Sequence, residues 1–117
     1  MGLDCSHDAF HCDYSEFYEL RQFVREARMS VEDYSKSEWT GLYEFLSHSD
    51  CDGEITPEMC IKVADDLDRL MPRMEAIAMN QESYWHIAHK GGFIAVVKKF
   101  IAGCRAAAAE NSPIYLI

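Results

Sequence analysis

The chain has 117 residues, 49% of them hydrophobic, which suits one globular domain over residues 1–117 rather than a disordered segment. Twenty acidic against eleven basic side chains give a net charge of −9, and eleven of the acids lie between residues 32 and 68. Such a surface repels nucleic acids and anionic membranes, so we expect neither of them as a partner.

The sequence also predicts a cytoplasmic protein. No apolar run approaches the roughly 20 residues that span a bilayer. The segment Met1 to Asp8 lacks the basic and apolar regions of a signal peptide. Five cysteines, an odd number, without an export signal predict reduced thiols.

The first helix is predicted to begin at Asp13, because Asp13 and Glu16 match a capping box. Arginines on another face make this helix amphipathic, so one side should dock on a core. The apolar side is formed by Phe17, Leu20, Val24 and Ala27. A polar connection is expected over residues 29–37.

Two further helices are predicted in the middle of the chain. A short one runs from Trp39 to Leu46 and is weakly interrupted by Gly41. The next begins at Thr56-Pro57-Glu58, where a capping hydroxyl, a proline and a first-turn acid follow one another. Pro72 is expected to end or bend this helix. Its predicted buried residues are Ile61, Ala64, Leu67, Leu70 and Met71.

The last predicted helix ends at Asn111 and Pro113. Its apolar side is formed by Phe93, Val97, Phe100, Ile101, Cys104 and Ala108. Residues 114–117 and 2–5 resemble short strands, and the two ends are expected to pair as a small sheet. The predicted fold is therefore mainly α, with α+β as the alternative: a compact bundle of about four helices.

One loop resembles the calcium loop of an EF-hand. With Gly53 at the invariant sixth position, Asp50 and Asp52 stand at positions 3 and 5, between two predicted helices. His48 at position 1 and Met59 at position 12 break the pattern, because carboxylates are needed there. The candidate metal ligands are Asp50, Asp52, Glu54 and Glu58.

Calcium takes six to eight oxygens, and the position 12 carboxylate normally supplies two, so calcium binding at this loop should be weak. Ile55 falls at position 8, the apolar residue that pairs two such loops. Two alternatives stay open. Asp50 and Asp52 can cap the turn and the following helix, or they can bind another divalent metal.

Two histidine-containing clusters are further candidates. The ligands Cys5, His7, His11 and Cys12 suit zinc, a weaker prediction than calcium because adjacent residues point in different directions. The Gly91-Gly92 pair precedes the last helix, where the glycines can expose backbone amides that bind an anion. A tight glycine turn or loose packing is the alternative for each cluster. The candidate small-ligand residues are His7, His86, His89 and Lys90.

Enzymatic motifs are missing: the sequence contains no nucleophile elbow, phosphate-binding loop or H-E-x-x-H motif. A hydrolytic carboxylate–histidine centre would need distant residues to converge. A binding role is therefore predicted over catalysis. The candidate partner-binding acids are Glu38, Glu44, Asp65, Asp66 and Asp68, which would contact a basic face of a host protein.

Three segments resemble a group of small uncharacterised proteins encoded by bacteriophages, prophages and some bacteria. They are the opening MGLD with Ser6-His7, the central HSDCDGEI at 48–55 and the late FIAGCR at 100–105. The resemblance implies a cytoplasmic accessory protein without a known mechanism. The small size, the acidic stretch and the missing catalytic motifs fit inhibition of a host defence protein, in the manner of an anti-CRISPR protein. A divalent-metal module and a small-ligand binder or hydrolase using His7 and His86 are the alternatives.

Overall fold

The computed structural model describes residues 2–5, 10–29, 31, 38–47, 53–78 and 92–115. Within these ranges the chain forms four helices and two small antiparallel sheets, which confirms the mainly α prediction. The helices are α1 (Tyr14–Met29), α2 (Thr40–Ser47), α3 (Pro57–Ala78) and α5 (Gly92–Ala109). The strands are β1 (Gly2–Cys5), β2 (Phe10–Asp13), β3 (Glu54–Ile55) and β4 (Ile114–Tyr115).

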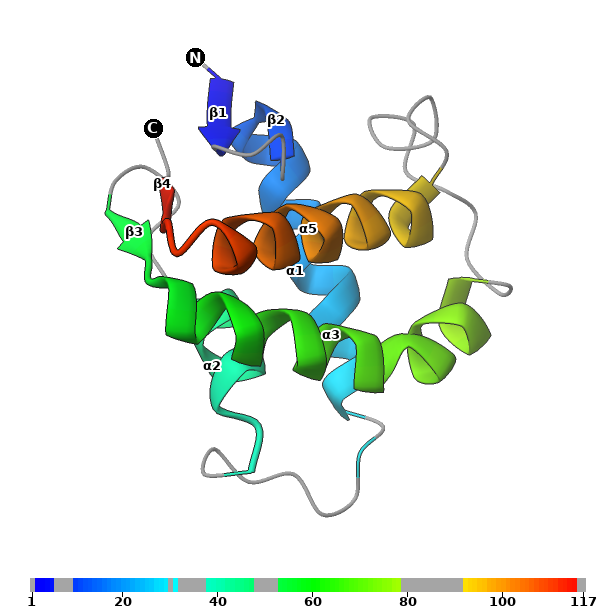
Figure 1. Cartoon of the computed structure of the whole chain (residues 1–117). Helices are drawn as coiled ribbons and strands as arrows, with labels where there is room; N and C mark the ends of the chain where they lie inside the picture. Colours follow the sequence, from blue (N-terminus) through cyan, green and yellow to red (C-terminus); the bar gives the residue numbers. More distant parts are fainter. Residues whose placement is uncertain are drawn as a thin grey trace.

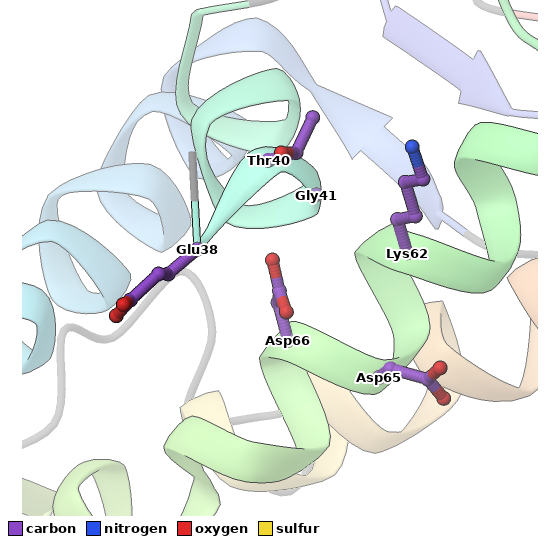
Figure 2. A pocket seen from close by; sticks show the side chains of 6 residues that line it. All are labelled: Glu38, Thr40, Gly41, Lys62, Asp65 and Asp66. Carbon is purple, nitrogen blue, oxygen red and sulfur yellow. The ribbon is translucent and has the colours of Figure 1, made fainter. Parts of the chain in front are cut away.

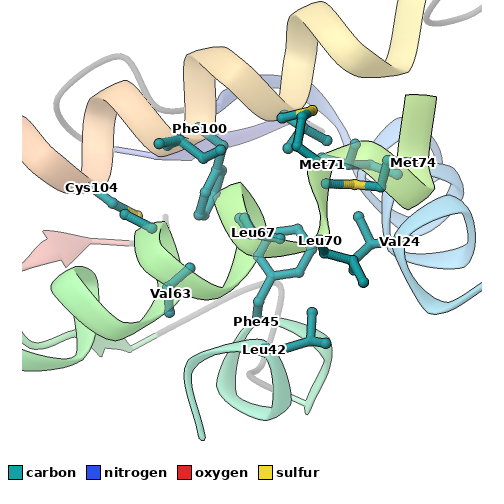
Figure 3. Close-up of a cluster of buried hydrophobic side chains, with 14 of the residues drawn as sticks. Val24, Leu42, Phe45, Val63, Leu67, Leu70, Met71, Met74, Phe100 and Cys104 are labelled. Carbon is teal, nitrogen blue, oxygen red and sulfur yellow. The ribbon is translucent and has the colours of Figure 1, made fainter. Parts of the chain in front are cut away.

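Helix α3 is the centre of the fold, packing mainly against α5 and α2 (Figure 1). Helices α3 and α5 run in opposite directions, and α1 crosses behind them. The rings of Phe45 on α2 and Phe100 on α5 meet edge to face, with centroids 5.0 Å apart (Figure 3). One buried apolar cluster therefore joins all four helices.

Most of the predicted buried stripe of α3 is confirmed. Ala64, Leu67 and Leu70 are fully buried. Ile61 is a wrong prediction, because it is 49% exposed. The stripe instead starts at Cys60 and continues through Val63, so Ile61 lies about 100° around the helix from Cys60 and beyond its edge. The side chains of Phe17 and Phe93 lie outside the described residues.

Pro72 does not end α3, which continues to Ala78. A proline inside a helix removes one backbone hydrogen bond and leaves a carbonyl without its partner. Pro72 lies on the exposed side of α3, where water can satisfy that carbonyl. The predicted end of the helix at Pro72 is therefore wrong, whereas a bend at this residue stays a prediction.

The predicted sheet between the two chain ends is also wrong. Strand β1 pairs instead with β2, in a local antiparallel hairpin. Strand β4 pairs with β3, with Ile114 opposite Ile55 and Tyr115 opposite Glu54. The antiparallel arrangement of α3 and α5 explains the second pairing, because it brings the start of one helix beside the end of the other (Figure 1).

Local capping fixes the helix boundaries beside this second sheet. The Thr56 hydroxyl accepts a hydrogen bond from the Met59 backbone N–H at 3.2 Å and caps α3. At the end of α5, Asn111 has a φ of 53°. The backbone N–H groups of Asn111 and Ser112 donate to the carbonyls of Ala108 and Ala107, which is a Schellman motif. The predicted stop at Asn111 is confirmed.

Candidate functional site

A shallow pocket of about 260 Å³ opens between the start of α2 and the first half of α3 (Figure 2). Five of its six lining residues have polar or charged side chains, and three of them carry carboxylates. The pocket is lined by Glu38, Thr40, Gly41, Lys62, Asp65 and Asp66. The predicted acids Glu38, Asp65 and Asp66 are thus brought together by the fold.

Gly41 allows α2 to approach α3 at this point. A Cβ atom on Gly41 would overlap the backbone carbonyl group of Lys62 and the backbone nitrogen of Val63. The residue that we interpreted as a weak helix interruption is therefore the contact surface between two helices. Its missing side chain creates the narrow space next to the pocket.

Asp66 lies between the two helices and is only 9% exposed. Its Oδ2 atom accepts a hydrogen bond from the Leu42 backbone N–H, 2.9 Å away. Leu42 is in the first turn of α2, so Asp66 caps this helix from α3 and complements its dipole. We predicted Asp66 as an exposed, partner-binding acid. That prediction is wrong, because the carboxylate is buried and hydrogen-bonded within the fold.

The second oxygen of Asp66, Oδ1, is differently placed. No hydrogen-bond donor within the described part of the chain reaches it. The Asp66 carboxylate points toward the first turn of α2, whereas the side chains of Glu38 and Asp65 point outward (Figure 2). One oxygen thus caps a helix while the other remains an acceptor in the pocket.

Asp65 and Asp68 are exposed on α3 and both contact Arg105 on α5. The Arg105 guanidinium lies 3.1 Å from Asp65 Oδ1 and 3.4 Å from Asp68 Oδ2. Side-chain exposures of 47% for Arg105, 60% for Asp65 and 63% for Asp68 leave these ion pairs well solvated. Water screening keeps such pairs weak, so the carboxylates remain available to another cation.

Glu38 is exposed, whereas Glu44 is half-buried on α2 and does not line the pocket. We use the term acidic surface for the three exposed carboxylates Glu38, Asp65 and Asp68. Next to it, the Arg69 guanidinium lies 3.8 Å from the ring centroid of the buried Trp39. This cation–π contact holds the segment before α2 against α3.

The EF-hand-like loop is described only from Gly53 onward. Gly53 has a φ of 89°, the positive value that favours glycine at the sharp turn. Ile55 is buried and forms a strand pair, but with Ile114 of β4 rather than with a second loop. Met59, at position 12, packs against the core.

Two of the four candidate metal ligands, Asp50 and Asp52, lie outside the described residues. Glu54 and Glu58 are both exposed. Among the residues with described positions, no group of three or more His, Cys, Asp or Glu side chains is arranged to bind a metal ion. The metal prediction therefore depends on a part of the loop that is not described.

The histidine-based sites likewise fall outside the described side chains. For the small-ligand site, these are His7, His86, His89 and Lys90. For the zinc cluster, they are Cys5, His7, His11 and Cys12. Both sites stay predictions from the sequence.

Cys104 on α5 is buried, as its place on the predicted apolar side implies, but the buried thiol of Cys60 on α3 beside it was not predicted. A hydrogen bond from the Cys104 side chain lowers the pKa of the Cys60 thiol below 9.0, although burial raises it. A second hydrogen bond, from the Ile114 backbone, also lowers this pKa. The Cys60 sulfur itself lies 3.5 Å from the Ile55 carbonyl. This thiol thus connects both long helices to the β3–β4 pair.

No described helix combines the length and hydropathy that a membrane span needs. We compared the chain with protein-family models, with curated proteins and with solved structures. None of these three comparisons produced a match.

Proposed function

We propose that this chain is a small protein-binding module whose acidic surface contacts a basic face of a partner protein. The observation that carries the proposal is the exposure of Glu38 and Asp65 at the pocket between α2 and α3, together with Asp68, which is exposed about one turn further along α3. Interaction sites that are built on packed helices keep their geometry without paying further ordering entropy on binding.

The distribution of charge along the chain supports this face as the one that contacts a partner. Residues 38–47 and 53–78 contain eight acidic and three basic side chains, whereas residues 92–115 contain one acidic and three basic. A one-sided negative field attracts a basic surface and accelerates its association. The same field disfavours nucleic acid and anionic membrane as partners.

The resemblance to phage and prophage proteins supports a narrower form of this proposal. In that form the partner is a host defence protein in the cytoplasm, and binding inhibits it. The odd number of cysteines supports a reducing compartment. The acidic surface would compete with a natural acidic ligand of the partner, because both would use the same basic face.

Capture with matched charge variants tests the proposal. One variant, Glu38→Gln/Asp65→Asn/Asp68→Asn, removes the acidic surface. The control variant removes the same number of charges from exposed positions elsewhere, through Glu26→Gln/Glu75→Gln/Glu110→Gln. Any protein that is captured from a bacterial lysate is then purified and its affinity for all three forms is measured.

We expect the control to bind like the wild type and the acidic-surface variant to bind at least tenfold more weakly, about 1.4 kcal/mol. Equal affinities of the two variants would refute the proposal. Circular dichroism of each variant separates lost binding from lost folding.

A divalent-metal module is the second candidate, favoured by the positive φ of Gly53 at the sixth position of the loop. Its ligands would be Asp50, Asp52, Glu54 and Glu58. If calcium binds there, millimolar calcium should raise the melting temperature by mass action, and Asp52→Asn should abolish the rise. An unchanged melting temperature would eliminate this candidate.

A further inference from the structure

Two buried thiols meet across the interface between α3 and α5. Cys60 lies in the first turn of α3 and Cys104 lies near the end of α5, and neither side chain is exposed. The Cys104 side chain forms a hydrogen bond with the Cys60 thiol, so the two sulfur atoms are direct neighbours. Figure 3 shows Cys104 extending from α5 toward α3. Neighbouring thiols can form a disulfide once side-chain rotation closes the remaining distance.

The packing around the two thiols suits a covalent link. A disulfide needs Cα atoms within about 7 Å of each other, which requires two helices to lie close together. One turn from each cysteine the buried residue is again small, Ala64 on α3 and Ala107 on α5. The distance between packed helices depends on the side chains at the contact, and small ones permit the shortest distances.

We propose that Cys60 and Cys104 are a modification site at which hydrogen peroxide forms a reversible disulfide. This inference does not depend on the proposed function. The Cys60 sulfur attacks one peroxide oxygen, the O–O bond breaks, and the thiol proton leaves with the released oxygen as water. Cys60 is then a sulfenic acid. The Cys104 sulfur attacks the Cys60 sulfur, the S–O bond breaks, and a second water leaves with the Cys104 proton.

The electrons balance in this sequence. Two thiols lose two electrons and two protons, and one peroxide accepts them to give two waters. A dithiol reductant reverses the change by thiol–disulfide exchange, so the reduced pair is the resting form in a reducing compartment.

The surroundings of Cys60 select it as the sulfur that reacts first. The thiolate is the reactive form, and hydrogen bonds from Cys104 and the Ile114 backbone lower the pKa of the Cys60 thiol. The first turn of α3 favours a negative charge in the same direction. Cys104 is already in contact and is therefore the sulfur that converts the sulfenic acid to a disulfide.

The β3–β4 pair controls the access of peroxide to the thiols. Cys60 contacts both strands, through the Ile55 carbonyl at 3.5 Å and through the Ile114 backbone. Each strand has only two residues, and a two-stranded ladder is marginally stable by itself. Local opening of this ladder admits a small oxidant while the helices stay packed. The reaction should therefore be slower than that of an exposed thiol.

The test is peptide mapping of the folded, full-length wild-type protein after treatment with hydrogen peroxide. Free thiols are blocked with N-ethylmaleimide, and the chain is cleaved after glutamate without reduction. Cys60 and Cys104 then lie on peptides 59–75 and 83–110, each with no other cysteine. We expect these two peptides joined, lighter by two hydrogen atoms, and separated again by dithiothreitol. The other three cysteines fall on different peptides, so every other pairing has a mass of its own.

The same treatment in urea is the control, because cysteines of an unfolded chain pair without guidance from the fold. The linked peptides should be the main disulfide product of the folded protein and a minor one in urea. Their absence from the folded protein, or equal abundance in both conditions, would overturn the proposal.

Two variants test the order of the reaction. Dimedone, which labels sulfenic acids, should label Cys60 in Cys104→Ala and should leave Cys104 unlabelled in Cys60→Ala. Equal labelling would overturn the assignment of Cys60 as the attacking sulfur. Circular dichroism confirms that both variants are folded, and the wild-type map does not depend on them.

The melting temperature tests whether the native fold accommodates the disulfide. The link closes a loop of roughly 45 residues in the unfolded chain, which lowers the entropy of that state. The oxidised protein should therefore melt about 5 °C or more above the reduced protein, and dithiothreitol should remove the difference. An unchanged or lower melting temperature would show that the native packing does not hold the link.

Discussion

The Asp66 carboxylate on α3 caps the first turn of α2 by accepting a hydrogen bond from the Leu42 backbone N–H over 2.9 Å. The two residues are 24 positions apart in the sequence. A helix of eight residues is marginal on its own, so α2 depends on such tertiary contacts for its stability. The same contact fixes the edge of the pocket that we assign to partner binding.

Asp66→Ala should destabilise the protein by about 1–3 kcal/mol, because it leaves a buried backbone N–H without an acceptor. Asp66→Asn retains an acceptor oxygen and should cost less. Asp68→Ala, on the same helix but exposed, is the matched control and should change the free energy of unfolding by about 0.5 kcal/mol or less. Urea denaturation measures all three. Equal losses for Asp66→Ala and Asp68→Ala would contradict the tertiary cap.

Gly41→Ala tests the close approach of α2 and α3 by the sign of its effect. Alanine is favoured over glycine within helices by roughly 0.5–1 kcal/mol, so a solvent-facing site would gain stability. At Gly41 the new methyl group meets the backbone of Lys62, and we expect a loss of about 1–3 kcal/mol. Thermal unfolding measures the stability of both Gly41→Ala and the comparison variant Ser47→Ala, which lies at the exposed end of the same helix. A more stable Gly41→Ala protein would show that the helices are farther apart.

Arg105→Ala should have little effect on the stability of the protein but should raise its affinity for a basic partner. Its two ion pairs are exposed, so their loss should cost less than about 1 kcal/mol. Losing the guanidinium frees Asp65 and Asp68, and the affinity for a basic partner should increase. Lys98→Ala removes an equal charge from an exposed site on α5 and controls for net charge. Isothermal titration should show a larger gain for Arg105→Ala, and an equal gain would indicate a purely long-range effect.

The free energy of unfolding should depend on the ionisation of Cys60. Hydrogen bonds from Cys104 and the Ile114 backbone lower the pKa of this thiol in the folded state below the ordinary 9.0. A group with a lowered folded pKa adds stability above its unfolded pKa and loses that contribution as the pH falls through the folded pKa. Stability should therefore rise with pH in the range just below 9.0.

Cys104→Ala removes the larger of the two hydrogen-bond contributions and should flatten this rise. Urea denaturation under reducing conditions, from about pH 7 to about pH 9, gives the slopes of both proteins. The comparison uses slopes, because the substitution also leaves a small cavity that lowers stability at every pH. Parallel slopes would show that Cys104 does not affect the Cys60 thiol.

Local signals in the sequence were sufficient to predict the helices and several of their ends. The Thr56-Pro57 start and the Asn111 stop depend on neighbouring residues alone, and both are present in the structure. Most of the core of α3 followed from 3.6-residue periodicity. The prediction that Ile61 is buried was wrong, because this periodicity does not define the edge of a buried stripe to within one residue.

Features that depend on residues far apart in the chain could not be predicted in this way. Asp66 looks like its exposed neighbour Asp65, and only the approach of α2 shows that it is buried. Gly41 looks like a helix breaker until the backbone of Lys62 lies against it. The pairing of β3 with β4 depends on two helices running in opposite directions. Tertiary packing decides all of these positions, and no pattern within a short window encodes it.

The central claim is that the acidic surface is the site of partner contact. Hydrogen exchange of the backbone amides, with and without a captured partner, tests it most directly. The account predicts new protection at residues 38–42 and 62–69, and little change along α1. Protection confined to α1 or to the basic side of α5, with residues 38–42 and 62–69 exchanging as in the free protein, would contradict it.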